Sequence, residues 1–387
     1  MTSTPSSQSA SAQPTAKKPF NHLKQLDGIR CIAVTLVLIS HWMAGHTTLP
    51  IGSLGELGVT IFFVLSGFLI IRILLSGKDQ IGQAPDKTPG GYFKNFYIRR
   101  ALRILPVYYV TVLVLALLGE PGIRETLVWL LIHATNFYVI VNGTWIGTAD
   151  HLWSLAVEQQ VYLFLPLLIF FVPHRAIPLT VGLMIVGSVA LRAVFYLLDL
   201  PWAVQYIFTL TCLDPFGFGG VLAYGYLYRR SGFERFFRGR WWLPLSIAAF
   251  FTVVFLYEFL PQVNHVNVMN YVCERFAASL LGFFLIGRAI LGFNGWMKWV
   301  LENRVSQYIG LISYGIYLFH NFIYNHYHTP PTHGTLRLWN RLVTYVPLLN
   351  AHYSLQLLYF AGLTIGLATL SWYLLEKPIN SLKVSFS

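Results

Sequence analysis

Apolar residues occur in eleven long runs along the chain, separated by shorter polar or Gly- and Pro-containing segments. Apolar runs of this length are typical of helices surrounded by lipid or by other apolar helices. The pattern therefore predicts an all-α fold, a polytopic bundle of helices in a membrane. The eleven segments are residues 30–46, 57–75, 104–119, 123–141, 152–172, 176–198, 207–228, 241–260, 272–292, 306–325 and 352–375.

Positive charge decides which of these runs cross the membrane, because loops rich in Lys and Arg stay in the cytoplasm. Residues 229–240 hold five arginines and residues 77–103 hold six Lys or Arg, so we expect both segments to be cytoplasmic. The segment 123–141 then begins and ends outside, and we interpret it as an interfacial or re-entrant helix. About ten transmembrane helices remain, with both termini cytoplasmic and 20 of the 27 Lys and Arg residues inside.

The composition agrees with a membrane protein. The chain is 55% hydrophobic and 11% charged, whereas soluble proteins are roughly 25% charged. The net charge of +12 follows from the cytoplasmic segments and indicates no nucleic-acid partner. The three cysteines have no paired spacing, and His326, His328 and His333 match no metal-site spacing, so we expect no disulfide framework and no metal.

Three regions are predicted. Residues 1–22 are rich in Ser, Thr, Ala and Pro and lack an apolar core with a cleavage site, which indicates a disordered cytoplasmic tail and no signal peptide. Residues 23–380 form the membrane domain. Residues 381–387 form a short C-terminal cytoplasmic tail.

Four predicted spans carry ionisable or hydroxyl side chains, which are costly inside a membrane and are candidates for function. Arg30 and His41 are eleven residues apart, about 16 Å and three helical turns, so their side chains point the same way. The other three spans place polar groups in the outer half of the membrane. These groups are His151, Ser154 and Glu158 on one helix face, Asp214 beside a proline, and Ser313, Tyr317 and His320 on another helix face.

These side chains also have structural explanations. His41 alone could form only a hydrogen bond between helices, and Glu158 could pair with a histidine or with Arg192. Asp214 could satisfy backbone groups that a proline-kinked helix leaves free. The hydroxyl groups in segment 306–325 could serve packing. The collection at similar depth is a stronger indication of function than any single member.

On the cytoplasmic side, Arg100 and Arg103 lie one helical turn apart in the stretch FYIRRALRILP. Both could be simple anchors of the span. Alternatively, they could form a fork for phosphate groups, which guanidinium groups bind through two parallel hydrogen bonds.

The sequence resembles the integral-membrane acyltransferase family 3, which includes O-acetylases of lipopolysaccharide, exopolysaccharides and nodulation factors. The resemblance covers about residues 23–380 and rests on six motifs in the family's order. The motifs are LDGIRCIAVTLVLISHW, GVTIFFVLSGFLI, FYIRRALRILPVYY, HLWSLAVEQQVYLFLPLL, SYGIYLFH and WYLLEKP. Members of the family have ten spans, in agreement with the count from charge.

The resemblance implies an acyltransferase that moves an acyl group, usually acetyl, from cytoplasmic acyl-CoA to a hydroxyl of a surface or exported glycan. Acyl-CoA, most often acetyl-CoA, is then a co-substrate, and no cofactor stays bound. The implied partners are a glycan or glycolipid acceptor and membrane lipids, and the implied location is the bacterial inner membrane. Some members carry a further SGNH domain; none is expected here, so a second transfer step would need a separate protein.

The resemblance implies His41, Glu158 and Arg30 as catalytic residues. His41 would accept the proton of the glycan hydroxyl, and Glu158 would fix its tautomer. Arg30, Tyr317 or a backbone N–H would stabilise the developing oxyanion. Arg100 and Arg103 would hold the phosphates of the donor.

The residues leave two points open. Direct transfer and an acyl-enzyme on Ser154 or Ser313 are both compatible with the sequence. A proton-coupled secondary transporter, with a relay through intramembrane His, Glu and Asp residues, is the alternative function; it would show repeat symmetry, and we see none. A non-catalytic flippase or assembly subunit is a third possible function. Supporting roles fall to His151, Ser154, Asp214, Ser313, Tyr317 and His320.

Overall fold

The computed structural model describes residues 23–47, 51–85, 87–261 and 267–382, and all regular secondary structure in these ranges is helical. The predicted all-α fold is therefore confirmed. The predicted tail of residues 1–22 lies outside the described residues, as does residue 383 onward in the predicted tail 381–387.

The helices fall into a long series with short breaks. The α-helices are α1 (Lys24–Trp42), α2 (Gly52–Gln80), α3 (Pro89–Leu118), α4 (Leu127–Leu131), α5 (Thr135–Asn142), α6 (Leu152–Phe171), α7 (Ile177–Leu197), α8 (Trp202–Ile207), α9 (Leu213–Tyr228), α10 (Arg230–Phe237), α11 (Trp242–Phe259), α12 (Arg275–Leu291), α13 (Gly295–Glu302), α14 (Arg304–Leu311), α15 (Ser313–Ile323), α16 (Gly334–Tyr345), α17 (Tyr353–Ser371) and α18 (Lys377–Ser381). The 3₁₀ turns are η1 (Gly147–Ala149), η2 (His174–Ala176), η3 (Thr209–Cys212) and η5 (Pro347–Asn350), and the π-helical turns are η4 (Met269–Glu274) and η6 (Trp372–Glu376).

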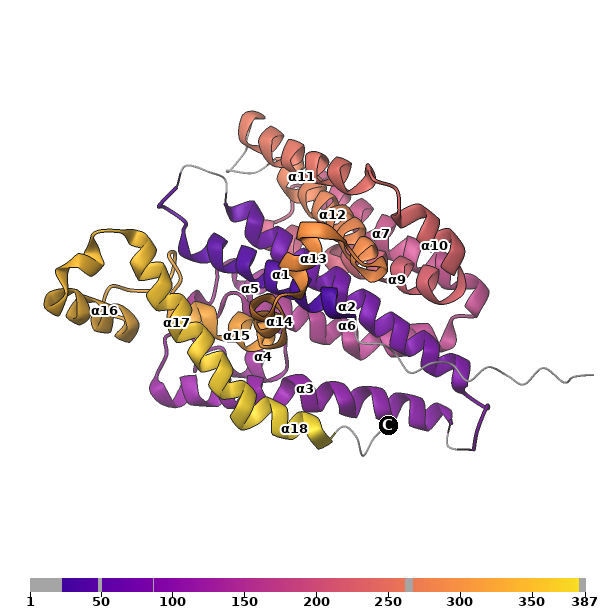
Figure 1. Cartoon of the computed structure of the whole chain (residues 1–387), viewed down its shortest axis with the longest axis horizontal. Coiled ribbons are helices and arrows are strands. Elements are labelled where there is room, and N and C mark those ends of the chain that lie inside the picture. Colours follow the sequence, from indigo (N-terminus) through magenta and orange to yellow (C-terminus); the bar gives the residue numbers. More distant parts are fainter. Residues whose placement is uncertain (1–22, 48–50, 86, 262–266, 383–387) are drawn as a thin grey trace, which may run out of the picture.

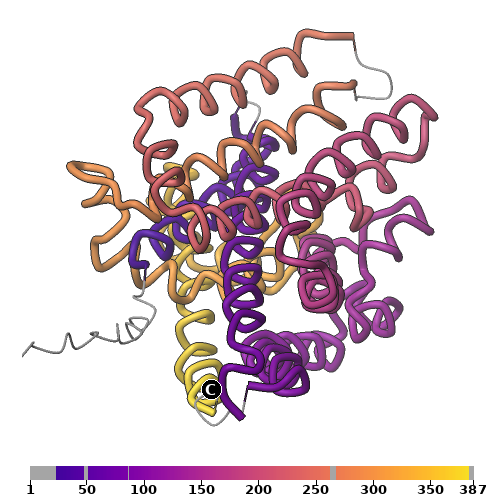
Figure 2. Tube along the Cα trace, turned by 90° about the vertical axis from the view of Figure 1, so that its right-hand side faces the viewer, coloured from indigo at the N-terminus to yellow at the C-terminus, as the bar shows by residue number. Residues whose placement is uncertain are grey.

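Helix α2 is the centre of the bundle and packs against α1, α6, α9 and α12. Helices α3 and α18 border one side of the molecule, and α10 and α11 border the opposite side (Figure 1). Figure 2 shows α11 along one edge of the bundle, with α12 packed beneath it. Most of the length of α2 is buried, which explains why its sequence is apolar on every face.

Glycines allow α2 and α9 to approach closely. A Cβ atom on Gly219 would lie 2.4 Å from the backbone nitrogen of Phe68. A Cβ atom on Gly67 would lie 2.6 Å from the carbonyl oxygen of Phe216. No side chain fits at either position without moving the helices apart, and small residues at helix contacts are the usual solution in membrane proteins.

Six described helical segments are long and apolar enough to cross a membrane, and seven if the bent pair Met269–Leu291 and Gly295–Glu302 counts as one span. By length and apolar composition, the described helices therefore give fewer than the ten predicted transmembrane spans. The shortfall has a physical reason, since three of the predicted spans are short or interrupted helices: α9 has 16 residues, α12 has 17 before a 92° bend, and α14 and α15 have 8 and 11. Helix α1 has 19 residues, but it carries Lys24, Asp27 and Arg30 in its first two turns.

The segment 123–141, predicted to lie at the interface, contains only the short helices α4 and α5. They have 5 and 8 residues and are separated by residues 132–134. His133 in this break has φ of 52°, a backbone conformation that ends a helix and is uncommon for a residue other than glycine. At about 1.5 Å per residue, neither helix is long enough to cross a bilayer.

Candidate active site

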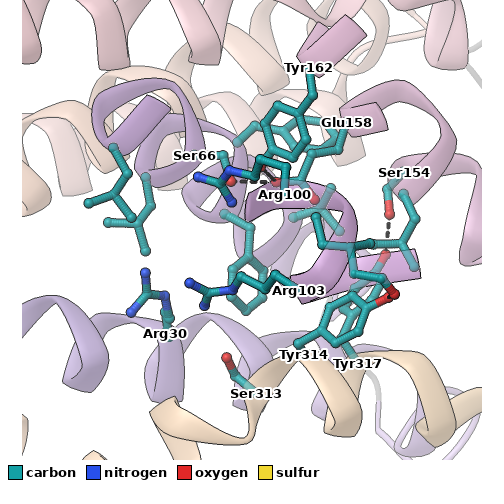
Figure 3. A pocket seen from close by; sticks show the side chains of 17 residues that line it. Arg30, Ser66, Arg100, Arg103, Ser154, Glu158, Tyr162, Ser313, Tyr314 and Tyr317 are labelled. Atoms are coloured by element: carbon teal, nitrogen blue, oxygen red, sulfur yellow. Dashed lines mark hydrogen bonds between the residues drawn. The ribbon is translucent and has the colours of Figure 1, made fainter. Parts of the chain in front are cut away.

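A cavity of about 100 Å³ lies between α1, α2, α3, α6 and α15 (Figure 3). Each of these helices contributes polar side chains to its wall. They are Arg30 from α1, Ser66 from α2, Arg100 and Arg103 from α3, Ser154, Glu158 and Tyr162 from α6, and Ser313, Tyr314 and Tyr317 from α15.

Three arginines from two helices lie at one end of this cavity, and the guanidinium groups of Arg30 and Arg103 point toward each other (Figure 3). Arg30 Nη1 donates to the carboxylate of Asp27, one turn earlier in α1. The guanidinium carbon of Arg100 lies 4.9 Å from the ring centroid of Tyr162. Arg103 is exposed, whereas Arg30 and Arg100 are half-buried. This end of the cavity is therefore positively charged and accessible, which favours an anionic ligand.

Glu158 faces this arginine cluster, not the histidine with which it was expected to pair. Its Oε1 accepts hydrogen bonds from the hydroxyls of Ser66 and Tyr162, whereas His41 Nδ1 lies 2.7 Å from His320 Nε2. The predicted pairing of Glu158 with His41 is therefore wrong. The physical reason is distance along α6: seven residues separate Glu158 from His151, about 10 Å, and only His151 is level with the histidines.

His41 and His320 are joined by a hydrogen bond. The contact that His320 makes at its other ring nitrogen determines which nitrogen of each ring carries the proton. The rings of His41 and His320 are 5.0 Å apart and nearly parallel, at 3°. His320 Nδ1 lies 2.6 Å from the carbonyl oxygen of Tyr317, and because a carbonyl oxygen only accepts, this nitrogen carries the proton. With both rings neutral, His320 Nε2 then accepts from His41 Nδ1–H. The lone pair of His41 is consequently on Nε2, the nitrogen that is left to act as a base.

Ser154 and Tyr317 lie between the arginine-lined cavity and these histidines. Their hydroxyl oxygens are 2.5 Å apart and lie 3.0 and 3.1 Å from the backbone oxygen of His151. Because each hydroxyl has one proton, one of them donates to this oxygen and the other donates to its hydroxyl neighbour. The ring of His151 is 4.9 Å from that of His320, and its Nε2 lies 3.0 Å from the carbonyl oxygen of Leu318. The deep end of the cavity is thus one side chain away from the histidine cluster of His41, His151 and His320.

Asp214 is part of a different site. It is fully buried and binds Arg192 through contacts of 2.7 and 3.2 Å. The hydroxyls of Ser188 and Ser279 also donate to it, at 3.1 and 3.0 Å, so the carboxylate joins α7, α9 and α12. This placement favours the structural explanation of Asp214 and rules out the pairing of Arg192 with Glu158.

Sequence reasoning missed two polar neighbours of Glu158. Tyr162 is four residues after Glu158 on the same helix face, a spacing that would have indicated it. Ser66 is a hydroxyl within the apolar run 57–75, but its contact with α6 comes only from tertiary structure. Ser313, a candidate for a supporting role, lines the cavity, and its hydroxyl donates to the carbonyl of Gly310 at 2.9 Å.

The histidines between α15 and α16, predicted to lie in an outer loop, make separate contacts. His328 Nε2 lies 2.5 Å from Asp150 Oδ2, and the backbone nitrogen of His326 donates to the carbonyl of His41 at 3.0 Å. Within the part of the chain that the structure describes, no group of three or more His, Cys, Asp or Glu side chains is arranged to hold a metal ion.

Known families show which class of enzyme this site belongs to. The family model described as "Acyltransferase domain" matches residues 23–376, nearly the whole chain. The protein therefore belongs to the acyltransferase family 3 and is an acyltransferase. This assignment disfavours the transporter alternative.

Similar proteins of known name are O-acetyltransferases. The peptidoglycan O-acetyltransferase OatA of Listeria monocytogenes is 26% identical over 332 residues, which are 79% of this chain and 50% of that protein. The O-acetyltransferase OatA of Staphylococcus aureus (strain NCTC 8325) is 27% identical over 320 residues, 77% of this chain and 50% of that protein. A protein of Staphylococcus aureus (strain COL), provisionally named an O-acetyltransferase, is 26% identical over 391 residues, 95% of this chain and 58% of that protein.

The chain thus spans between half and three fifths of the length of these relatives. No solved structure matches the chain at a significant level. The relatives are bacterial, and the apolar helices described above indicate a membrane protein.

Proposed function

We propose that this protein transfers an acetyl group from cytoplasmic acetyl-CoA to a hydroxyl group of an exported cell-surface glycan. The observation that carries the proposal is the cavity of the active site, which is lined by three arginines at one end and reaches Ser154 and Tyr317, beside the histidine cluster, at the other. An anionic donor with a long neutral arm matches this distribution of positive charge and hydroxyl groups.

The donor would bind with its phosphates at the arginine end. Arg30, Arg100 and Arg103 supply three positive charges. Glu158 in the wall and Asp27, bound to Arg30, supply two negative charges, so one positive charge is in excess. Guanidinium groups bind phosphate oxygens through paired, charge-assisted hydrogen bonds. The pantetheine arm would then follow α2 past Ser66 and bring the thioester to Ser154 and Tyr317.

The transfer itself is an attack of a glycan hydroxyl oxygen on the thioester carbon. His41 Nε2 accepts the hydroxyl proton while the new C–O bond forms, and collapse of the tetrahedral intermediate breaks the C–S bond. The CoA thiolate leaves and takes up a proton, so the products are the acetylated glycan and CoA. General-base assistance of this kind is worth about 10²–10⁴-fold in rate.

His320 takes the orienting role that Glu158 was expected to have. Its Nε2 accepts from His41 Nδ1–H, and this bond keeps the lone pair on His41 Nε2. The hydroxyls of Tyr317 and Ser154, or the guanidinium of Arg30, are the donors nearest to the oxyanion that develops on the thioester. In direct transfer, Ser154 acts as one of these donors and no acyl-enzyme forms.

Charge supports the orientation in the bacterial inner membrane. The arginine end of α3 belongs to the basic segment 77–103, which would face the cytoplasm together with residues 229–240 and both termini. The acceptor would be on the other side. In this proposal α1, α9, α12 and the α14–α15 pair add to the six long helices and complete ten spans.

A cell-wall glycan is the acceptor class that the relatives support, because one of them is named a peptidoglycan O-acetyltransferase. The test uses the purified full chain in detergent with acetyl-CoA and a soluble oligosaccharide, chitotriose. Release of the CoA thiol is followed with a thiol-reactive dye, and acetylated sugar is identified by mass spectrometry. We expect wild-type turnover and a loss of about 10²–10⁴-fold in His41→Ala.

His352→Ala is the matched control, because His352 is an exposed histidine just before α17 and lies outside the site. It should retain wild-type activity. Absence of thiol release by the wild type, or an undiminished rate in well-folded His41→Ala, would contradict the proposal.

A further inference from the structure

A second and larger cavity, of about 420 Å³, opens at the N-terminal end of α2. Gly52, Ser53 and Glu56 of α2 line it, whereas the lining of the first cavity starts at Val59, one turn further along the same helix. The two cavities are therefore neighbours along α2: the second ends at Glu56, and the first begins at Val59. In the proposed topology the first faces the cytoplasm and the second faces outward.

The charged side chains of the second cavity differ in how they are paired. Glu56 is bound by Arg275 Nε at 2.6 Å and by the hydroxyl of Tyr206 at 2.6 Å. Glu274 instead accepts from uncharged groups, the amide of Asn270 at 2.8 Å and the hydroxyl of Ser53. Glu274 is buried, at 3% exposure, and lines the cavity. Its carboxylate retains capacity to accept further hydrogen bonds, since each carboxylate oxygen has two lone pairs.

Two other lining side chains hold polar atoms without partners. Gln205 is 3% exposed and Arg192 is 1% exposed. Gln205 Oε1 and Arg192 Nε have no hydrogen-bond partner within the described part of the chain. Buried polar atoms are rarely left unsatisfied, and a cavity wall where this happens is a place where a ligand supplies the missing bonds.

Aromatic rings complete the wall. The rings of Trp145 and Trp202 lie 4.8 Å apart at 44°, and both residues are only half-buried. Tyr257 and Tyr271 line another part of the cavity. Aromatic faces with polar groups at their rims suit a ligand that has both apolar C–H faces and hydroxyl edges.

We propose that this second cavity binds a pyranose ring of the acceptor glycan, with Trp145 and Trp202 against the C–H face of the ring and Glu274, Asn270 and Gln205 on its hydroxyls. The inference rests on the proposed function, for which it names the acceptor site. The volume lies in the range of small-ligand sites, about 300–1,000 Å³. The wall has no excess of positive charge to attract a phosphate, because Arg275 binds Glu56, Arg192 binds Asp214, and Glu274 adds a further carboxylate.

The position of the cavity brings a sugar close to the base. A Cβ atom on Gly55 would lie 2.6 Å from Ser40 Oγ, and Ser40 Oγ donates to the carbonyl of Gly52 at 3.4 Å. The residue before His41 therefore touches the same turn of α2 that forms the cavity wall. The reaction then requires the glycan to extend from this wall toward His41.

Calorimetric titration of the purified full chain with chitotriose and with maltotriose tests the site. We expect the wild type to bind at least one of the two sugars, and Trp202→Ala and Glu274→Gln to weaken that binding at least about 10-fold. Trp202→Phe keeps a ring and should recover affinity to within about 3-fold. Affinity for acetyl-CoA, measured in the same samples, should stay unchanged, which shows that each variant is folded.

Trp296→Ala and Glu125→Gln are the matched controls, because both residues are exposed and lie outside the cavity. Both should bind the sugars as the wild type does. The inference is overturned if the wild type binds neither sugar. It is also overturned if Trp202→Ala and Glu274→Gln bind the sugars as tightly as the wild type does. If instead the sugars bind and the wild type releases no thiol from acetyl-CoA, the proposed reaction fails and the sugar site stands.

Discussion

Two sets of arginines in this protein have the same chemistry and opposite surroundings. Arg192 and Arg275 are buried in the bundle, and each binds a carboxylate at 2.7 and 2.6 Å. Arg30, Arg100 and Arg103 line an accessible cavity with two nearby carboxylates, Glu158 in the lining and Asp27 bound to Arg30. In the first set, charge is balanced within the protein. In the second set, positive charge exceeds negative charge.

The difference indicates what each set does. A buried charge without a partner costs several kcal/mol, so the paired arginines mainly fix how helices pack. Excess positive charge at a cavity is stabilised only when an anion arrives, so the open arginines are suited to binding. Residue type in a span does not separate these roles, whereas the balance of charge around the residue does.

The largest effect should come from breaking a buried pair. Asp214→Asn leaves the guanidinium of Arg192 buried without its counter-charge, and we expect a loss of about 3–5 kcal/mol in stability or no folded protein. Thermal unfolding in detergent, followed by the fraction of monodisperse protein, measures this. The double variant Arg192→Met with Asp214→Leu removes both charges and should recover most of the loss.

Arg103→Met provides the contrast at the open site, where we expect a change within about 0.5 kcal/mol. If Asp214→Asn melts like the wild type but loses transferase activity, Asp214 is a functional residue and the comparison between the two sets fails.

Much of the fold could be predicted from apolar runs and loop charge. The all-helical class follows from the runs themselves, and the helical breaks in segment 123–141 agree with its exclusion from the spans. The lengths of individual helices could not be predicted, because the interruptions depend on packing. The break between α14 and α15 at Ile312, for example, lies in an apolar stretch without proline.

The sequence could predict many of the residues that form the candidate site, but it could not predict which of them contact each other. Helical periodicity placed Ser313, Tyr317 and His320 on one face; Tyr317 lies beside His151, and His320 contacts His41. Similar depth in the membrane suggested that Glu158 meets His41, yet depth says nothing of the direction in which a side chain points. The contact of His41 with His320 joins residues 279 positions apart, and no local pattern encodes it.

The next largest effect concerns His320, which positions His41. His320→Ala removes the acceptor for His41 Nδ1–H, and a lost hydrogen bond of about 1–3 kcal/mol corresponds to about a 5–150-fold lower kcat. KM for acetyl-CoA should stay within about 2-fold, because His320 lies outside the arginine cavity. Steady-state kinetics with varied donor separate the two constants.

His320→Gln is the informative companion, since its amide oxygen can take the place of the accepting Nε2. It should recover part of kcat. Equal losses in the Ala and Gln variants, together with lower melting temperatures, would assign His320 to packing only.

Removing one open arginine should have a smaller effect on binding. We expect Arg100→Ala or Arg103→Ala to raise KM for acetyl-CoA about 10-fold, in line with one charge-assisted contact to phosphate. Arg99→Ala is the matched control, because Arg99 is exposed on the same helix and is not part of the cavity lining. Equal KM values in all three variants would show that Arg100 and Arg103 do not bind the donor and only anchor the span at the membrane surface.

The smallest effect is expected for Glu158→Gln, which tests whether the excess of positive charge in the arginine-lined cavity determines the KM for acetyl-CoA. The amide oxygen of glutamine still accepts from Ser66 and Tyr162, so the local hydrogen bonds are kept. Loss of the negative charge makes the cavity more positive, and at a half-exposed site this is worth about 0.5–1 kcal/mol. KM for acetyl-CoA should therefore fall about 2–5-fold at low salt, and the gain should shrink as salt increases. Because Glu158 does not contact His41, kcat should change little; a kcat lowered 100-fold with unchanged KM would show that this carboxylate acts in the chemical step after all.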